Sequence, residues 1–109
     1  MLKGKGKLLR VFVGEEDKNE GIPLYEWILQ KAKADGLAAA TVLKGFEGLG
    51  DDKEVHTAKI MRLAQDLPII VEIVDQEEKV LSFTEQIDSV IKNGLATIED
   101  IEIHFYRKG

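Results

Sequence analysis

The sequence predicts a single α+β domain in which strands and helices follow one another in the order β-α-β-β-α-β. Three observations lead to this prediction. Four short segments are rich in aliphatic and β-branched residues, two others carry apolar residues at helical spacing, and one long polar stretch separates the second strand from the third. At 109 residues, the chain is long enough for one domain (1–109) with a buried core.

The first strand is expected over residues 7–13, where alternate positions are apolar, and it ends at Gly14. Residues 1–6 before it are expected to be a flexible tail. After a charged connection, Pro23 suits the first turn of a helix, because its missing N–H would have no partner there. Gly36 stops this helix. Three apolar residues form its buried stripe: Leu24, Ile28 and Ala32.

The second and third strands are expected on either side of a long polar segment. Residues 38–46 form the second strand and run into a glycine-rich stretch. Residues 69–74 are almost continuously apolar, which predicts a central position in the sheet. The intervening residues 47–66 form an excursion between the two strands.

A second helix and a last strand complete the chain. Asp75 lies three residues before Glu78, an aspartate version of the capping box that starts a helix. Gly94 is expected to close this helix. Residues 101–106 alternate strictly, as expected for a strand with one buried face. Five apolar residues recur at helical spacing in the helix: Val80, Phe83, Ile87, Val90 and Ile91.

Right-handed crossovers in each βαβ half give a four-stranded antiparallel sheet with both helices on one face, the ferredoxin-like plait. One set of residues is expected beneath the helices: Leu9, Val11, Val13, Ile69, Val71, Ile73, Ile101, Ile103 and Phe105. The other set is expected on the open face: Leu8, Arg10, Phe12, Ile70, Glu72, Val74, Glu102, His104 and Tyr106.

This open face is more apolar than the surface a monomer usually leaves in water. We therefore expect other copies of the chain to cover it, with Arg10 pairing Glu72 or Glu102. The alternative is an isolated monomer with a mixed surface.

Composition excludes several classes of protein. Twenty acidic residues outnumber fifteen basic ones and give a net charge of −5, so we expect no nucleic-acid binding through counterion release. No apolar run approaches the ~20 residues of a membrane helix, so no membrane insertion is expected. The absence of cysteine excludes disulfides and thiolate metal sites. The first residues lack the apolar segment of a secretion signal, which predicts a cytoplasmic protein.

The sequence offers no constellation typical of an enzyme, and we expect none. His56 and His104 are the only histidines, and Ser82 and Ser89 both fall on the second expected helix without a local base. No Walker lysine follows the glycines after the second strand.

Those glycines are nevertheless a candidate site for an anionic ligand. Gly45, Gly48 and Gly50 allow the backbone to approach phosphates, and Lys44, Lys59 or Arg62 supply positive charge. Two alternatives stay open. In the first, the glycines serve the turns of a long hairpin loop, and Lys59 and Arg62 lie on the polar face of a short helix. A metal could use four residues of the excursion: Asp51, Asp52, Glu54 and His56.

Three segments, in their order, resemble the PII-type nitrogen-signalling proteins. Thr41-Val42-Leu43-Lys44-Gly45-Phe46 is similar to the end of that family's second strand, which leads into its long T-loop. Leu67-Pro68 resembles the start of the family's return strand, and His56-Thr57 resembles a His-Thr within the loop. The excursion is about as long as a T-loop.

The sequence is more closely similar to an uncharacterised branch of PII-like proteins, through Arg10-Val11-Phe12-Val13-Gly14-Glu15 and Pro23-Leu24-Tyr25. The resemblance implies a homotrimer with ligand clefts between subunits, where adenine would pack near Phe46, Pro68 and Ile69. After the second helix, the chain departs from PII proteins, because residues 93–100 replace their Gly-Asp-Gly-Lys phosphate loop.

We therefore expect a trimeric sensor that requires no cofactor. It would bind ADP, ATP, AMP or another small anion between subunits and regulate a protein partner, still unidentified, through its loop. The expected ligand-binding residues are Lys44, Gly45, Phe46, Gly48, Gly50, His56, Thr57, Lys59, Arg62, Pro68 and Ile69. A structural trimer without a nucleotide ligand is the main alternative, and the acidic metal-binding loop is a third.

Overall fold

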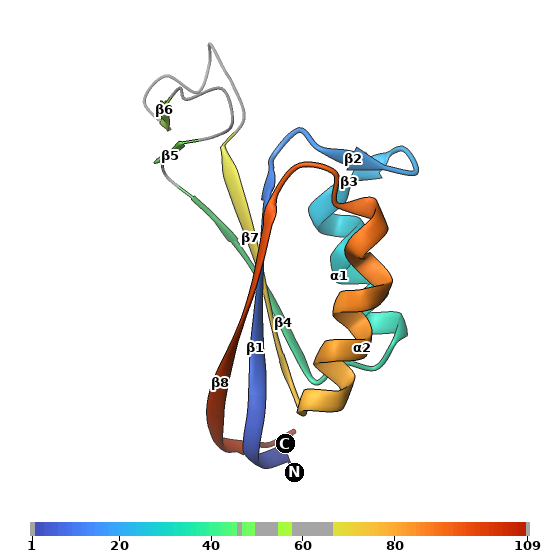
Figure 1. Ribbon diagram of the computed structural model, residues 1–109, viewed down its shortest axis with the longest axis vertical. Coiled ribbons are helices and arrows are strands. Elements are labelled where there is room, and N and C mark those ends of the chain that lie inside the picture. The colour runs from blue at the N-terminus through green and yellow to red at the C-terminus, as the bar shows by residue number, and fades with distance from the viewer. Residues whose placement is uncertain (1, 46, 50–54, 58–66, 109) are drawn as a thin grey trace.

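The computed structural model describes residues 2–45, 47–49, 55–57 and 67–108. Its main sheet contains four antiparallel strands in the order β4-β7-β1-β8, and helices α1 and α2 cover one face (Figure 1). The expected α+β, ferredoxin-like fold is confirmed. The main elements are β1 (Leu2–Gly14), α1 (Leu24–Ala34), β4 (Ala39–Lys44), β7 (Pro68–Asp75), α2 (Glu77–Ile87) and β8 (Leu95–Tyr106).

Two short hairpins accompany the main sheet. Strand β2 (Lys18–Asn19) pairs with β3 (Ile22–Pro23) just before α1. Strand β5 (Glu47–Leu49) pairs with β6 (Val55–Thr57) within the excursion between β4 and β7. None of the helices in the described ranges is long and apolar enough to cross a membrane.

The core lies between the helices and the covered face of the sheet. Leu9, Val11, Val71 and Ile73 are fully buried there, as expected. The predicted stripe of α1 is confirmed, because Leu24, Ile28 and Ala32 are buried. The predicted stripe of α2 is confirmed for Val80, Phe83 and Ile87, whereas Val90 and Ile91 lie beyond the end of the helix and are partly buried. Each valine, leucine, isoleucine or phenylalanine side chain among them contributes about 1.5–3 kcal/mol when it is fully buried. These two stripes therefore hold both helices on one face of the sheet.

The predicted capping box at Asp75 is wrong. Asp75 is the last residue of β7 and only 3% exposed, and the N-cap of α2 is Gln76, which makes no side-chain capping bond. One carboxylate oxygen of Asp75 accepts the N–H of Ala38 at 2.8 Å, and the other accepts the N–H of Gln76 at 2.6 Å. The carboxylate serves two main-chain donors at the junction of β4, β7 and α2, because burial makes an unpaired N–H costly.

Helix α2 is also shorter than expected. It ends at Ile87, and a 3-10 turn (Asp88–Val90) follows it. Gly94 therefore does not close the helix. A Cβ at this position would lie 2.5 Å from the carbonyl oxygen of Phe12, so glycine is required where the chain passes close to β1 before β8 begins.

The first and the last strand of the chain both begin earlier in the sequence than expected. Strand β1 begins at Leu2, and residues 2–6 are not the flexible tail we predicted, because they pair with β8. Strand β8 begins at Leu95 rather than at residue 101, opposite Phe12. Main-chain hydrogen bonding between the two ends of the chain thus extends both strands.

The assignment of β8 to the two faces was wrong. Leu8 lies opposite Glu99, and Gly6 lies opposite Ile101. Ile101 and Ile103, which we expected beneath the helices, therefore share the open face with Glu99. By the same alternation, Glu102 leaves the open face. Phe105, expected beneath the helices, is 53% exposed. Strict alternation separates two faces without saying which is buried, and only the register with β1 decides this.

Candidate functional site

Three chain segments meet where the excursion leaves the sheet, at the ends of β1 and β4 and the start of β7 (Figure 1, upper end). The N–H of Glu15 donates to the carbonyl of Leu67 at 2.9 Å, and the N–H of Gly45 donates to the carbonyl of Pro68 at 2.7 Å. Leu67 is 1% exposed and anchors the returning chain. We name this region, residues 14–15, 44–45 and 67–68, the loop root.

Gly45 is needed in the loop root for close packing. A Cβ there would lie 2.4 Å from Cγ of Pro68 and 3.1 Å from its carbonyl oxygen. The N–H of Gly45 is already donated to that carbonyl. At this position, therefore, the structure favours the alternative in which glycine serves the turn of the chain. An anion at the loop root would have to be bound by side chains and not by the N–H of Gly45.

Lys44 supplies positive charge at the loop root. Its side chain is 47% exposed, and its Nζ lies 2.5 Å from a carboxylate oxygen of Glu15. Glu15 was not among the expected site residues, although it directly follows Gly14 at the end of a central strand. The register of β1 with β7, which the sequence does not reveal, is what brings it beside Lys44.

The other expected site residues fall into three groups. Pro68 lies at the loop root and Ile69 follows it directly, but Ile69 is 3% exposed and belongs to the core, so its side chain is not available to a ligand. Gly48, His56 and Thr57 are strand residues of the β5–β6 hairpin, where Gly48 lies opposite His56. The third group lies outside the described residues: Phe46, Gly50, Lys59 and Arg62.

The proposed metal ligands Asp51, Asp52 and Glu54 also lie outside the described residues. Within the part of the chain that the structure describes, no group of three histidine or acidic side chains is placed to hold a metal ion. A hollow of about 370 Å³ lies against α2, and its lining, which includes Leu37, Ser82 and Phe83, contains no residue of the loop root.

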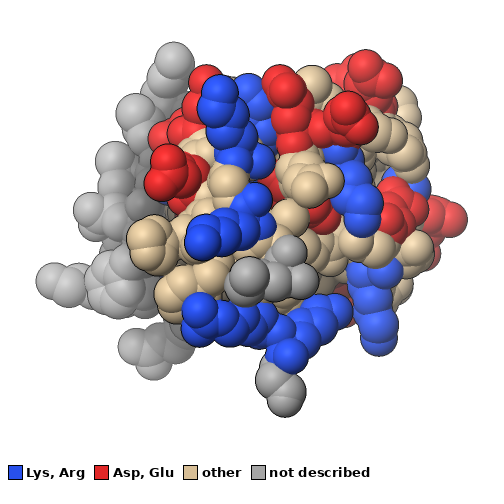
Figure 2. All heavy atoms as spheres, turned by 90° about the horizontal axis from the view of Figure 1, so that it is seen from below, with Lys and Arg blue, Asp and Glu red and all other residues tan. Residues whose placement is uncertain are grey.

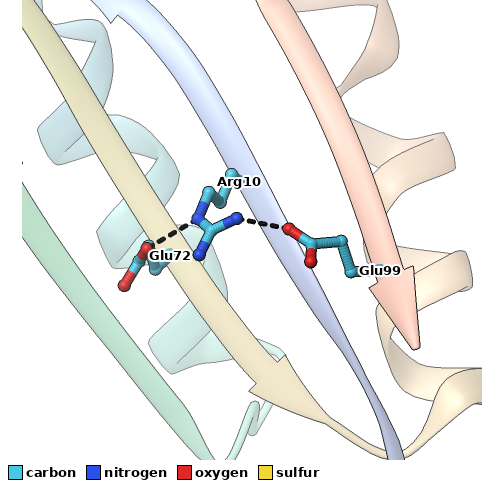
Figure 3. A network of polar contacts seen from close by, with 3 residues as sticks. All are labelled: Arg10, Glu72 and Glu99. Carbon is cyan, nitrogen blue, oxygen red and sulfur yellow. Dashed lines mark hydrogen bonds and ion pairs between the residues drawn. The ribbon is translucent and has the colours of Figure 1, made fainter. Parts of the chain in front are cut away.

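A polar network crosses the middle of the open sheet face (Figure 3). Arg10 on β1 donates from Nε to Glu72 on β7 at 2.8 Å, and its Nη1 contacts Glu99 on β8. The predicted pairing with Glu72 is confirmed, and Glu99 takes the place of the predicted Glu102. The hydrogen bond to Glu72 is the main cause that raises the pKa of Arg10.

Apolar rows flank this network. Leu43, Ile70, Phe12 and Leu95 lie opposite one another across all four strands on the loop side of Arg10. On the other side, Ala39, Val74 and Leu8 form a shorter row. Leu43 is 44% exposed and Leu95 is 56% exposed in the single chain. The open face thus combines two apolar rows with polar residues between them, whose charges already form ion pairs within the same chain.

The order of the helices and strands, the strand order of the sheet and the long excursion between β4 and β7 together define a PII-like fold. A structure of CPII, a nitrogen regulatory PII-like protein from Thiomonas intermedia K12 bound to ADP, AMP and bicarbonate, is similar with a TM-score of 0.71. It is 17% identical, and the likeness covers 93% of this chain and 90% of that one. CutA1 from Oryza sativa is similar with a TM-score of 0.60 at 13% identity, over 96% of this chain and 85% of that one.

The chain belongs to the family DUF190, described as "Uncharacterized ACR, COG1993", whose model matches residues 6–103. A UPF0166 protein of Aquifex aeolicus is 44% identical over 99 residues, which cover 91% of this chain and 93% of that protein. A UPF0166 protein of Methanocaldococcus jannaschii is 39% identical over 101 residues, covering 92% and 93%. The predicted resemblance to an uncharacterised PII-like branch is therefore confirmed.

Proposed function

We propose that this protein is a non-catalytic PII-like sensor. It binds an adenine nucleotide or a similar small anion at the loop root, in clefts between the subunits of a trimer, and reports occupancy to a partner protein through the excursion. The observation that carries the proposal is the loop root itself, where Lys44 lies beneath the excursion in a PII-like fold. The solved neighbour with this fold carries ADP, AMP and bicarbonate.

The open sheet face supports assembly. Its apolar rows hold Leu43 and Leu95, and each leucine that becomes fully buried between copies contributes about 1.5–3 kcal/mol. The cation in the middle of this face already has two carboxylate partners within its own chain. Arg10 can therefore enter an interface without becoming an unpaired buried charge, which would be strongly unfavourable.

Ligand binding and the loop are connected through Glu15. An anionic ligand at Lys44 competes with the Glu15 carboxylate for the same ammonium group. The backbone of Glu15 is hydrogen-bonded to Leu67, where the excursion returns to the sheet. Glu15, at the end of β1, thus contacts the chain on both sides of the excursion, at Lys44 and at Leu67, and a bound ligand would change the first of these contacts. Such a change shifts the loop only as far as the ligand's affinity differs between the two loop states.

Calorimetric titration of the purified protein with ADP, ATP, AMP and bicarbonate tests this proposal. We expect saturable heat for at least one of them, and a ligand at 100 times its Kd should stabilise the fold by about 2.7 kcal/mol, seen as a raised melting temperature. Absence of both effects at millimolar concentration would support the structural trimer without a ligand. A melting shift with a divalent metal alone would support the acidic metal-binding loop.

Substituting Glu15 by glutamine is expected to tighten binding of the anionic ligand. The ligand would no longer compete with an exposed ion pair worth about 0.2–1 kcal/mol, so its affinity should rise about 1.4- to 5-fold. Lys44→Gln should weaken binding. Asp35→Asn is the matched control, because it breaks the Lys31–Asp35 ion pair of 3.1 Å at the end of α1. If the original protein binds the ligand and Glu15→Gln binds it with the same affinity, Glu15 does not compete with the ligand for Lys44.

A further inference from the structure

The turn at residues 14–17 joins the end of β1 to the β2–β3 hairpin and carries Glu15 into the loop root. Asp17 closes this turn with two hydrogen bonds. Its carboxylate accepts the N–H of Gly14 at 2.8 Å, and its own N–H donates to the carbonyl of Gly14 at 3.2 Å. Gly14 and Asp17 thus hold the two ends of the turn together, with Glu15 and Glu16 between them.

Gly14 needs these bonds because β1 extends beyond the pairing with β8 at this end. That pairing stops at Phe12, opposite Leu95, so among the described residues Gly14 has no partner in β8. On the other side of β1, Gly14 lies opposite Pro68, which has no N–H to donate. Asp17 therefore satisfies main-chain groups of Gly14 that β8 does not reach.

The turn is also fixed to α1 and to the excursion. The carbonyl of Asp17 accepts the N–H of Leu24, the first residue of the helix, at 2.7 Å. The N-cap residue Pro23 has no side-chain acceptor for the first donors of the helix, so the turn serves one of them. The N–H of Glu15 donates to the carbonyl of Leu67 at 2.9 Å. The backbone of Glu15 is therefore held on both sides.

A single cation faces this turn at the loop root. Residues 14–17, 44–45 and 67–68 include three carboxylates and one cation, Lys44. The Lys44 ammonium group lies 2.5 Å from a carboxylate oxygen of Glu15. While this contact persists, the described part of the loop root offers an anion no unpaired positive charge. The ligand affinity of the site therefore depends on how firmly Glu15 is held.

We infer that Asp17 regulates ligand binding at the loop root by holding the carboxylate of Glu15 on Lys44. The inference rests on the proposed function, because the ligand is the anion proposed for this site. A carboxylate on a fixed backbone loses less conformational freedom on pairing than one on a loose turn. The fixed turn therefore makes Glu15 an intramolecular competitor of high effective concentration. Asp17 acts through Glu15 and is a positioning residue.

A basic region at the opposite end of the molecule also attracts anions and requires a control. Residues 2–7 and 100–108 carry five cations and two carboxylates. Figure 2 looks onto this end and shows Lys and Arg side chains in the middle of the view, with most acidic side chains toward its upper and right margins. Lys3→Gln with Arg107→Gln removes two of these cations and should leave ligand affinity unchanged. Loss of binding in this variant would overturn the inference.

Titration of Asp17→Asn and Asp17→Ala with ADP, ATP, AMP and bicarbonate tests the inference. Asparagine keeps an oxygen acceptor for the N–H of Gly14 and alanine does not, whereas both variants lose the same charge. We expect Asp17→Ala to bind the anion about 1.4- to 5-fold more tightly than Asp17→Asn, since it can gain at most the loss of an exposed ion pair. A residue that only stabilised the fold would not tighten binding when removed. Equal or weaker binding by Asp17→Ala would overturn the inference.

The same comparison in a Glu15→Gln background shows whether Asp17 acts through Glu15. With the competing carboxylate absent, Asp17→Ala and Asp17→Asn should bind the anion with equal affinity, because interacting residues have non-additive effects. If Asp17→Ala still bound more tightly in this background, Asp17 would act by another route and the inference would be wrong.

A measurement without ligand separates this inference from the proposed function. The ion pair with Glu15 shields the Lys44 ammonium group from an amine-labelling reagent. Lys44 should therefore be labelled faster in Asp17→Ala than in Asp17→Asn, as measured by mass spectrometry. Equal labelling would overturn the inference even in a protein that binds nucleotide. If none of the four anions binds, the proposed function fails, and the labelling still decides whether Asp17 holds Glu15 on Lys44.

Discussion

Replacing Leu43 by glutamate is expected to reduce the solution mass of the protein from three chains to one. Leu43 is 44% exposed in the single chain and lies in the apolar row beside Ile70 on the open sheet face. The single chain can tolerate a charge at an exposed position, whereas an assembled interface would bury it without a partner, at a cost of several kcal/mol. Light scattering at micromolar concentration measures the mass.

Leu81→Glu is the control for this experiment. Leu81 lies on α2 and is 42% exposed, so the same substitution is made at nearly the same exposure on the opposite side of the molecule. This variant should keep the mass of the original protein. The trimer proposal would be wrong if the original protein had the mass of one chain, or if Leu43→Glu kept the mass of three.

Substituting Gly94 by alanine is expected to destabilise the fold strongly. The new Cβ would lie 2.5 Å from the carbonyl oxygen of Phe12, a main-chain atom of a central strand that cannot move aside easily. Overpacking of this kind costs about 1–3 kcal/mol. For a domain of this size, that lowers the melting temperature by about 5–20 °C. Thermal unfolding followed by circular dichroism measures the change.

Gly21→Asn provides the comparison for Gly94→Ala. Gly21 has a φ of +81°, which asparagine tolerates, and a Cβ there would meet no atom within 4 Å. The melting temperature of Gly21→Asn should fall much less than that of Gly94→Ala. Equal losses in the two variants would show that the close approach of residue 94 to β1 does not determine the effect.

Periodicity was sufficient to predict the helices and the central strands. Leu24, Ile28 and Ala32 recur at helical spacing and are buried, because an amphipathic helix has one orientation that covers the sheet. The last strand was harder, since its alternation gives two faces and Ile101 was assigned to the wrong one. The deciding fact is that Leu8 lies opposite Glu99, a pairing between residues distant in sequence.

The candidate site was only partly predictable. Lys44 and Gly45 were identified from a strand that runs into glycines, and they do lie together at the loop root. A sequence cannot distinguish a glycine that is needed for anion binding from one that is needed for packing. Gly45 is of the second kind, because the chain there packs closely against Pro68. Glu15 was missed because its proximity to Lys44 comes from the sheet and not from any local pattern. Asp75 was misassigned for the same reason, because its partner Ala38, just before β4, is distant in the sequence.

The pairing of β1 with β8 also bears on how the chain is made. Strand β1 lies between β7 and β8, and the contact of Lys7 with Asp100 joins residues 93 positions apart. Contacts of such long range form slowly, because a large loop must be closed first. During synthesis, the first strand emerges long before either neighbour, so the sheet can be completed only after β8 has left the ribosome.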